Sequence, residues 1–183
     1  MRVIAGAAKG RKLASPPSAT RPLTAKAKEA LFSSLGDVVR NASILDLYAG
    51  SGSIGLEAMS RGAERAVFVE RDRKAFETLR RNIAAVGLGG EAVRRDVATF
   101  LTATLTATSN RFDVVFVDPP YAASAAEIDG VLALVGNLMV PGGIIVVHRR
   151  TGSPAPVLDF HGSMSERRYG DSQLYTILVE AER

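Results

Sequence analysis

Short apolar runs alternate along this chain with segments whose apolar residues recur at every third or fourth position. The runs show little apolar–polar alternation, which is typical of strands buried on both faces, whereas the wider spacing indicates amphipathic helices. The pattern predicts strands over residues 44–47, 66–70, 92–96, 112–118 and 144–148. It predicts helices over residues 24–35, 72–86, 99–107 and 124–138, and one more that follows a Gly-rich turn and ends near Arg61.

Capping residues support these helix boundaries. Thr24 and Asp72 are suited to accept hydrogen bonds from the first free N–H groups of their helices, and Gly87 is suited to end the helix that Asp72 begins. Ser124 and Glu127 have the spacing of a capping box. The local signals therefore agree with the periodicity.

The C-terminal region follows a different pattern. Two short β segments, residues 165–169 and 174–180, are joined by a Gly-Asp turn, and they leave no room for a crossover helix, so this pair is expected to be antiparallel. The five strand–helix repeats before it predict a Rossmann-like, doubly wound α/β sheet that is mostly parallel. At 183 residues the chain is expected to form one domain, over residues 24–183, preceded by a short basic extension over residues 1–23.

The extension is rich in Gly, Ala and Pro with interspersed cations. It is expected to form a short strand or hairpin at best, and to become ordered only against another surface. Residues 1–30 contain seven Lys and Arg residues and one acid, Glu29, while the whole chain has a net charge of +4. A basic segment on a mildly acidic body predicts a polyanionic partner, and a solvated tail is the alternative.

Composition excludes several classes of site. The chain has no cysteine, which excludes disulfides, cysteine-ligated zinc and cysteine nucleophiles, and no metal site is expected. The basic N-terminal residues are not followed by the apolar segment of a signal peptide, and no apolar run is long enough to cross a bilayer. We therefore expect a cytoplasmic protein that does not associate with membranes.

A Gly-rich stretch follows the first predicted strand. Gly50, Gly52 and Gly55 fit the pattern G-x-G-x-x-G, in which glycines allow a tight turn and a close approach of the backbone to a ligand. The helix that opens there presents free N–H groups, which favour a polar or nucleotide-like group. The pattern fits a dinucleotide enzyme as well as a methyltransferase, and a purely structural turn is a third reading.

Acidic residues stand at or beside the ends of four predicted strands: Asp46, Glu70, Asp96 and Asp118. Ligands of open α/β sheets bind outside the carboxyl ends of the strands, so these acids are expected to converge. Glu70 is placed to accept both hydroxyls of a ribose, and Asp96 to receive an exocyclic amine of an adenine. Val97 and Phe100 are candidates for the apolar walls of that ring, although both residue types are more often core.

The most specific motif is Asp118-Pro119-Pro120-Tyr121, directly after a strand. The two prolines fix the backbone, so that the Asp118 carboxylate and the Pro119 carbonyl are held at the sheet edge beside the aromatic face of Tyr121. Two acceptors and a stacking plate suit a planar base with an exocyclic amine. Because acceptance of both amine hydrogens favours a pyramidal nitrogen, the motif predicts transfer of a group to that nitrogen, mainly by orientation and electrostatics.

These motifs together resemble those of class I S-adenosylmethionine (AdoMet) methyltransferases: Asp46-x-x-x-Gly50-x-Gly52-x-x-Gly55, Glu70 and Asp118-Pro-Pro-Tyr121. Four N-terminal segments are similar to the RsmD-type family, which methylates a guanine N2 of 16S ribosomal RNA: Arg2-Val-Ile-Ala-Gly, Gly10-Arg-Lys-Leu, Arg21-Pro-Leu-Thr24 and Glu29-Ala-Leu-Phe32. The similarity runs over nearly the whole chain.

The resemblance implies a role for each motif. AdoMet would be bound by Asp46, Gly50, Ser51, Gly52, Gly55, Glu70, Arg71, Asp96 and Val97, and the target base by Asp118, Pro119 and Tyr121. RNA would be bound by Arg2, Lys9, Arg11, Lys12, Arg21 and Thr24, with 16S rRNA in the small ribosomal subunit as the partner of a monomeric enzyme. One departure is His148-Arg149 at the end of the fifth strand, where an acid is expected in relatives.

Three other functions share part of this pattern. An adenine-N6 nucleic-acid methyltransferase uses the same Asp-Pro-Pro-Tyr turn, but it normally carries an inserted recognition segment. A nicotinamide dehydrogenase shares the Gly-rich turn but has no use for Asp118-Pro-Pro-Tyr. A non-catalytic RNA-binding chaperone needs only the basic extension, and the acids at the strand ends argue against it.

Overall fold

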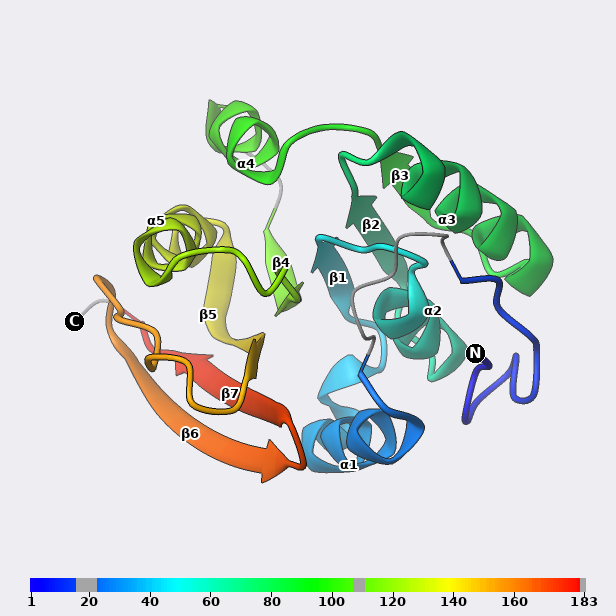
Figure 1. Cartoon of the computed structure of the whole chain (residues 1–183), viewed down its shortest axis with the longest axis horizontal. Coiled ribbons are helices and arrows are strands. Elements are labelled where there is room, and N and C mark those ends of the chain that lie inside the picture. The colour runs from blue at the N-terminus through cyan, green and yellow to red at the C-terminus, as the bar shows by residue number, and fades with distance from the viewer. Residues whose placement is uncertain (16–22, 107–110, 182–183) are drawn as a thin grey trace.

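The computed structural model describes residues 1–15, 23–106 and 111–181. Its centre is a seven-stranded sheet in the order β3-β2-β1-β4-β5-β7-β6, as Figure 1 shows. The pairs among β1 to β5 are parallel, whereas β7 is antiparallel to both β5 and β6. The strands are β1 (Ser43–Leu47), β2 (Arg65–Val69), β3 (Glu91–Val93), β4 (Phe112–Val117), β5 (Met139–Arg150), β6 (Gly162–Tyr169) and β7 (Ser172–Val179). The predicted Rossmann-like sheet with an antiparallel C-terminal pair is confirmed.

Helices cover both faces of the sheet. One face carries α1 (Ala25–Leu35), α2 (Ser53–Ser60) and α3 (Arg73–Val86), and the other carries α4 (Val97–Thr106) and α5 (Ala125–Gly136). The predicted caps are present, because Thr24 and Asp72 accept hydrogen bonds from the N–H groups of Ala27 and Ala75. A short 3₁₀ helix, η1 (Gly36–Val39), leads from α1 into β1. Among the described residues, no helix is long and apolar enough to cross a membrane.

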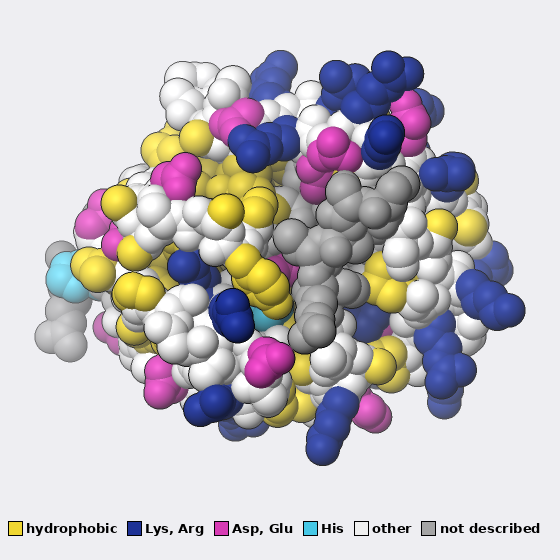
Figure 2. Space-filling model, in the orientation of Figure 1, with side chains coloured by type: hydrophobic (Ala, Val, Ile, Leu, Met, Phe, Trp, Pro, Cys, Tyr) yellow, Lys and Arg dark blue, Asp and Glu magenta, His cyan; other side chains and the backbone are white. Residues whose placement is uncertain are grey.

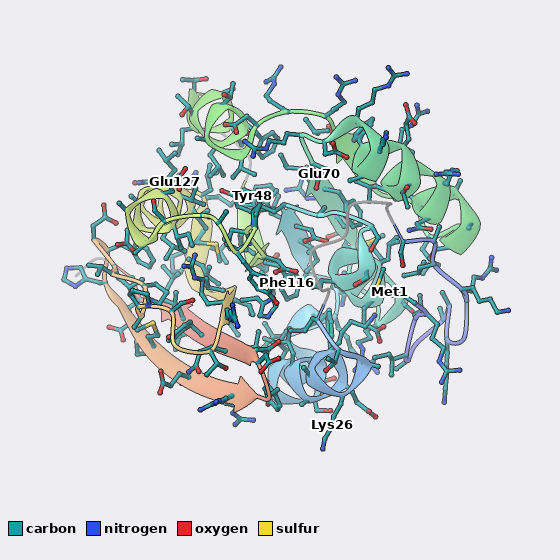
Figure 3. All side chains as sticks on the ribbon, in the orientation of Figure 1. Met1, Lys26, Tyr48, Glu70, Phe116 and Glu127 are labelled. Carbon is teal, nitrogen blue, oxygen red and sulfur yellow. The ribbon has the colours of Figure 1, made fainter. Side chains whose placement is uncertain are left out.

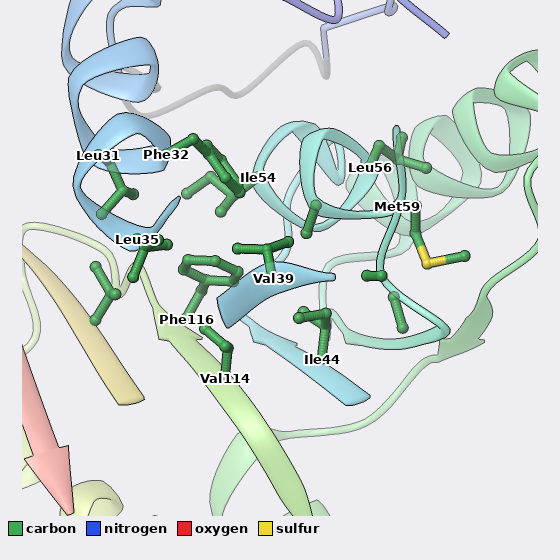
Figure 4. Close-up of a cluster of buried hydrophobic side chains, with 14 of the residues drawn as sticks. Leu31, Phe32, Leu35, Val39, Ile44, Ile54, Leu56, Met59, Val114 and Phe116 are labelled. Atoms are coloured by element: carbon green, nitrogen blue, oxygen red, sulfur yellow. The ribbon is translucent and has the colours of Figure 1, made fainter. Parts of the chain in front are cut away.

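Two apolar clusters, one on each face, hold the layers together. In the cluster of Figure 4, Phe116 of β4 meets Phe32 of α1 with 5.8 Å between the ring centroids. Leu31 and Leu35 extend the same face of α1, at the spacing that the sequence predicts for a buried helix stripe. This packing fixes α1 against the sheet beside the end of β4.

Among the five parallel strands, two differ most from the prediction, and the C-terminal strands β6 and β7 begin three and two residues earlier than predicted. β3 is an edge strand with β2 as its single partner, and it already ends at Val93. Asp96 therefore lies in the loop beyond the strand. β5 begins at Met139 rather than at residue 144. Its Pro-Gly-Gly segment is absorbed into the strand through a shift of register against β4, with Gly142 at a φ of +80°.

The basic extension is not a free arm. Residues 1–15 fold back on themselves with a β-bridge between Arg2 and Lys12, and they bury Val3, Ala8 and Leu13 in the cluster of α2 and α3. The expectation that the extension orders only against another surface is confirmed for residues 1–15, and the body of the domain supplies that surface. The division at residue 23 stays a prediction, because residues 16–22 lie outside the described residues.

Besides these apolar contacts, polar side chains of α2 hold the extension. The buried carboxylate of Glu57 accepts hydrogen bonds from the N–H groups of Ile4 and Ala5, at 2.8 and 3.0 Å. The hydroxyl of Ser60 accepts from the N–H group of Ala8 at 2.9 Å. These partners are backbone groups, which explains why side-chain patterning gave no sign of the contact.

Candidate active site

The Gly-rich turn after β1 has the predicted conformation. Gly50 and Gly52 have φ values of +56° and +77°, a region that non-glycine residues rarely adopt. A Cβ atom at Gly52 would lie 2.5 Å from the Leu79 side chain, whereas at Gly50 it would meet nothing closer than 3.9 Å. Gly52 is thus required by its backbone conformation and its packing, and Gly50 leaves room for a ligand to approach.

Asp46 supports this turn from inside. Its buried carboxylate accepts a hydrogen bond from the Gly55 N–H group at 2.9 Å, and a Cβ atom at Gly55 would lie 2.4 Å from the Phe68 ring. Burial raises the pKa of Asp46 well above its usual value, the Gly55 bond opposes that rise, and the negative charges of Asp118 and Glu70 add to it. The structure therefore gives Asp46 a role in holding the turn.

Two more predicted cofactor residues are buried. Ser51 has its carbonyl bonded to the Asn82 amide at 2.9 Å, and Asn82 also binds both backbone groups of Ala14. Val97 is part of the core cluster on the α4 side, and Phe100 packs against the same cluster. Asn82 thus links the Gly-rich turn to the N-terminal extension, which the sequence did not predict.

Glu70 lies half-buried at the end of β2, beside the turn. One carboxylate oxygen accepts from the Gly50 N–H group at 2.9 Å and the other from the Asp72 N–H group at 2.7 Å. A carboxylate has about four lone-pair positions, so acceptor capacity remains for the hydroxyls of a ribose. The structure brings Glu70 and the Gly-rich turn together as the sequence predicts.

A cavity of about 570 Å³ opens next to these residues. Arg71 and Asp96 lie on its rim with 3.8 Å between their charged atoms, and Tyr48 and Pro120 line its wall together with Ala98, Ala123, Val131 and Leu134. In Figure 3 Tyr48 lies between Glu127 of α5 and Glu70. This is a size and composition suited to a nucleoside-like ligand.

Tyr48 is a residue of this cavity that the sequence analysis missed. It follows β1 with a positive φ of +59°, rare for a non-glycine residue, and so turns its ring toward the cavity. Burial raises the pKa of Tyr48, the negative charges of Asp96 and Glu127 add to that rise, and Arg71 opposes it. The only available signal was its position inside the stretch Asp46-Leu-Tyr-Ala-Gly50.

The Asp118 turn ends β4. The Asp118 side chain is 26% exposed, Pro119 is buried, and Tyr121 is 42% exposed. One oxygen of Asp118, Oδ1, lies 2.7 Å from Nδ1 of His148, and Arg149 donates to the Ala123 carbonyl in the loop that follows the turn. The two residues that depart from the expected acid at the end of β5 therefore both contact the Asp118 region.

Tyr121 faces a second cavity, of about 550 Å³. This cavity lies between the start of α1 and the turn that joins β6 to β7, and is lined by Thr24, Lys26, Ala27, Tyr121, Arg168, Tyr169, Gly170, Asp171 and Ser172. Its far wall comes from the C-terminal hairpin, which carries no recognisable motif, and so the sequence analysis missed it. Pro120 lines the first cavity and Tyr121 the second, so the turn separates the two.

The predicted RNA-binding residues divide into three groups. Arg2, Lys9, Arg11 and Lys12 are exposed on the N-terminal extension. Figure 2 shows Lys and Arg side chains gathered along the side of the molecule where α3 and residues 1–15 lie. Thr24 caps α1 and lines the Tyr121 cavity, and Arg21 lies outside the described residues. Within the described residues, no group of acids and histidines could hold a metal ion.

Comparisons with known proteins identify relatives of this chain. Residues 1–178 match the family model described as "Conserved hypothetical protein 95". The chain is 38% identical over 156 residues to YlbH of Bacillus subtilis, a candidate rRNA methyltransferase, with 82% of this chain and 83% of YlbH covered. It is 32% identical over 178 residues to ribosomal RNA small subunit methyltransferase D of Escherichia coli strain K12, with 97% and 88% covered. The solved structure of yhhF from Escherichia coli superposes with a TM-score of 0.86 at 30% identity, over 100% of this chain and 99% of that one.

The fold and the names of these relatives define the class of the protein: it is a methyltransferase. Within that class, the chain belongs to the Conserved hypothetical protein 95 family, which is the RsmD-type family of 16S rRNA methyltransferases. The resemblance drawn from the motifs is confirmed.

Proposed function

We propose that this protein transfers a methyl group from AdoMet to the exocyclic N2 amine of a guanine in 16S rRNA of the small ribosomal subunit. The observation that carries the proposal is the Asp118-Pro-Pro-Tyr121 turn, which stands between two cavities. A methyl donor in the first cavity, lined by Tyr48 and Arg71, and a base in the Tyr121 cavity would meet at Asp118. This substrate implies a cytoplasmic location.

The first cavity, together with Glu70 and the Gly-rich turn beside it, fits the chemistry of AdoMet. Glu70 offers acceptors for the ribose hydroxyls of AdoMet. Gly50 has no side chain, so the rest of AdoMet can approach the backbone there. Tyr48 and Leu134 provide apolar surface for an adenine, and Asp96 lies at the rim for its amine. When bound there, AdoMet supplies a methyl group on a positively charged sulfur, so that no metal is needed to activate it.

Asp118 and Pro119 act on the acceptor. The carboxylate oxygen that does not face His148, together with the Pro119 carbonyl, accepts the two amine hydrogens, which directs the nitrogen lone pair at the methyl carbon. On transfer, the N–C bond would form as the C–S bond breaks, the electron pair of that bond would remain on sulfur, and the nitrogen would lose its proton to the Asp118 carboxylate or to solvent. Tyr121 stacks on the base and keeps it in the plane that this geometry requires.

The RNA surface follows from the exposed cations. Arg2, Lys9, Arg11 and Lys12 lie on the packed N-terminal extension and are available to phosphates, and Lys26 and Arg168 lie at the mouth of the Tyr121 cavity. Because residues 1–15, 23–106 and 111–181 form no separate recognition module, a folded subunit with a splayed-out base is expected to be a better substrate than free RNA.

A methylation assay tests this function. Small subunits from cells that lack the protein are incubated with it and labelled AdoMet, and the RNA is digested to nucleosides. We expect the label in N2-methylguanosine, less of it with naked transcript, and none with the Asp118→Ala variant. Label in N6-methyladenosine would favour the adenine alternative, because Asp118 and Pro119 accept from either amine.

A further inference from the structure

His148 is a buried histidine that the proposed function leaves without a role. Its side chain, on β5, is 4% exposed, with Nδ1 at 2.7 Å from Asp118 Oδ1 and Nε2 at 2.9 Å from the Ser172 hydroxyl. Asp118 follows β4 and Ser172 begins β7, and these strands flank β5 in the sheet. A hydrogen-bonded chain therefore crosses three neighbouring strands and ends on the acid of the Asp118 turn.

The direction of the first hydrogen bond is set by chemistry. An ionised carboxylate only accepts, so Nδ1 of His148 carries the hydrogen that points at Asp118. A serine hydroxyl both donates and accepts, so Ser172 satisfies Nε2 whether the ring is neutral or charged. Among the described residues, no buried side-chain nitrogen or oxygen lacks a partner.

The same ring also supports Tyr121. The Tyr121 and His148 rings meet edge-on, with centroids 6.4 Å apart and an interplanar angle of 70°. One buried side chain thus contacts both the acceptor and the stacking plate of the turn. Without it, the partly exposed Asp118 carboxylate is free to rotate about its Cβ–Cγ bond.

We propose that His148 is a positioning residue for methyl transfer. Its Nδ1–H group holds Oδ1 of Asp118 and so turns Oδ2 toward the target amine, while Ser172 fixes the ring. This inference rests on the proposed function, in which Asp118 binds the amine. The proposed role also explains why a histidine can occupy a position where an acid is expected in relatives. His148 donates a hydrogen bond to Asp118, whereas an acid there would accept one from the substrate.

A pair of amide variants tests the role. In His148→Asn the amide nitrogen hangs from the same Cγ atom as Nδ1 and can still donate to Asp118, whereas in His148→Gln it lies farther out, near Nε2. We expect His148→Gln to lower kcat about 100-fold, the effect of misplacing a reacting group by about 1 Å, and His148→Asn to stay within about 10-fold of the wild type. The KM for AdoMet is expected to change less than about threefold in both, because the variants disturb orientation rather than binding.

The control and a second readout separate this role from packing. His161 is exposed and is the only other histidine, so His161→Gln is a matched change that should leave kcat unchanged. In the same His161→Gln protein, the only histidine signals in ¹⁵N NMR come from His148, and in the neutral ring the hydrogen should be on Nδ1. A hydrogen on Nε2, or equal losses in the Asn and Gln variants with the fold intact, would overturn the proposal.

The proposed function and the positioning role fail differently. If Asp118→Ala keeps its turnover, the proposed function of the turn is wrong, whatever His148 does. If Asp118→Ala is inactive and His148→Gln matches the wild type, only the positioning role is wrong.

Discussion

Glu57 is expected to be the anchor of the N-terminal extension, and Glu57→Gln is the perturbation that tests this. The Glu57 side chain is fully buried and binds Lys28 Nζ at 3.3 Å and Arg61 Nε at 2.9 Å besides the Ile4 and Ala5 amides. Lys28 is 4% exposed, and its other partners are carbonyl oxygens. Glutamine keeps the shape of the side chain but removes the only carboxylate that, among the described residues, pairs with this buried cation.

The size of the effect follows from burial. Removal of one partner of a buried ion pair costs about 3–5 kcal/mol, because an uncompensated charge is left inside the protein. We expect Glu57→Gln to lose about 3 kcal/mol of unfolding free energy, at the lower end, since its carbonyl still accepts one hydrogen bond. Glu77→Gln on α3 is the matched control, because the Glu77–Arg73 pair is exposed and should contribute less than about 1 kcal/mol.

The pH dependence gives a second signature. Burial lowers the pKa of Lys28, and the charge of Glu57 and its hydrogen bond oppose that shift, so that removal of the Glu57 charge lowers the pKa further. Folding disfavours the charged form of a base whose pKa is lowered. The buried Lys28 charge therefore reduces folding stability at pH 7, and this cost disappears as the pH rises toward 10.5, the ordinary pKa of lysine. The deficit of Glu57→Gln should therefore shrink as the pH rises.

Urea unfolding followed by circular dichroism measures the stability, and hydrogen exchange at the amides of Ile4 and Ala5 reports the extension. We expect both amides to lose protection in Glu57→Gln. The double variant Lys28→Met/Glu57→Gln should recover part of the stability, since it removes the unpaired buried cation while the glutamine carbonyl still accepts a hydrogen bond from the extension. A deficit below about 1 kcal/mol with both amides still protected would refute the anchor.

Three further predictions concern the site. Glu70→Ala should weaken AdoMet binding by about 1.5–3 kcal/mol in calorimetry without unfolding the protein, and unchanged affinity would remove the ribose assignment. Asp46→Asn should melt at a higher temperature than the wild type at pH 7 but not below pH 4. Because the pKa of Asp46 is raised in the folded protein, this residue's contribution to folding stability is present below about pH 3.8 and is lost as the pH rises. Asparagine does not ionise, so the variant does not lose stability in this way. Lys9→Glu/Lys12→Glu should weaken RNA binding. It should also lower the slope of log affinity against log salt concentration by about 1 for each phosphate that the variant no longer neutralises. An unchanged slope would exclude contact of these side chains with RNA.

Local signals made most of the fold predictable. The Ser124–Glu127 capping box and the Asp72 cap each involve residues three positions apart, so periodicity and capping chemistry identified these helices without tertiary information. The adjacency of Glu70 and Gly50 was also accessible, because the carboxyl ends of neighbouring parallel strands must meet at one sheet edge.

Long-range polar contacts were not predictable in the same way. Glu57 lies in a short helix where a charged residue is usually taken as exposed, and its burial depends on backbone groups more than 50 positions away. His148 and Ser172 reach Asp118 only because β5 lies between β4 and β7, an order that local patterns do not determine. The sequence singled out His148 as a departure, but its contact with Asp118 required the structure.

The acids at the strand ends illustrate a balance that the proposed chemistry needs. Each has a partner of its own: Gly55 N–H for Asp46, Gly50 and Asp72 N–H for Glu70, Arg71 for Asp96, and His148 for Asp118. Unpartnered carboxylates would stabilise the positive sulfur of bound AdoMet, whose charge disappears during methyl transfer. An interaction stronger in the ground state than in the transition state slows the reaction. By engaging the acids with N–H donors and an arginine, the fold keeps their geometry for binding while it reduces the charge that would oppose catalysis.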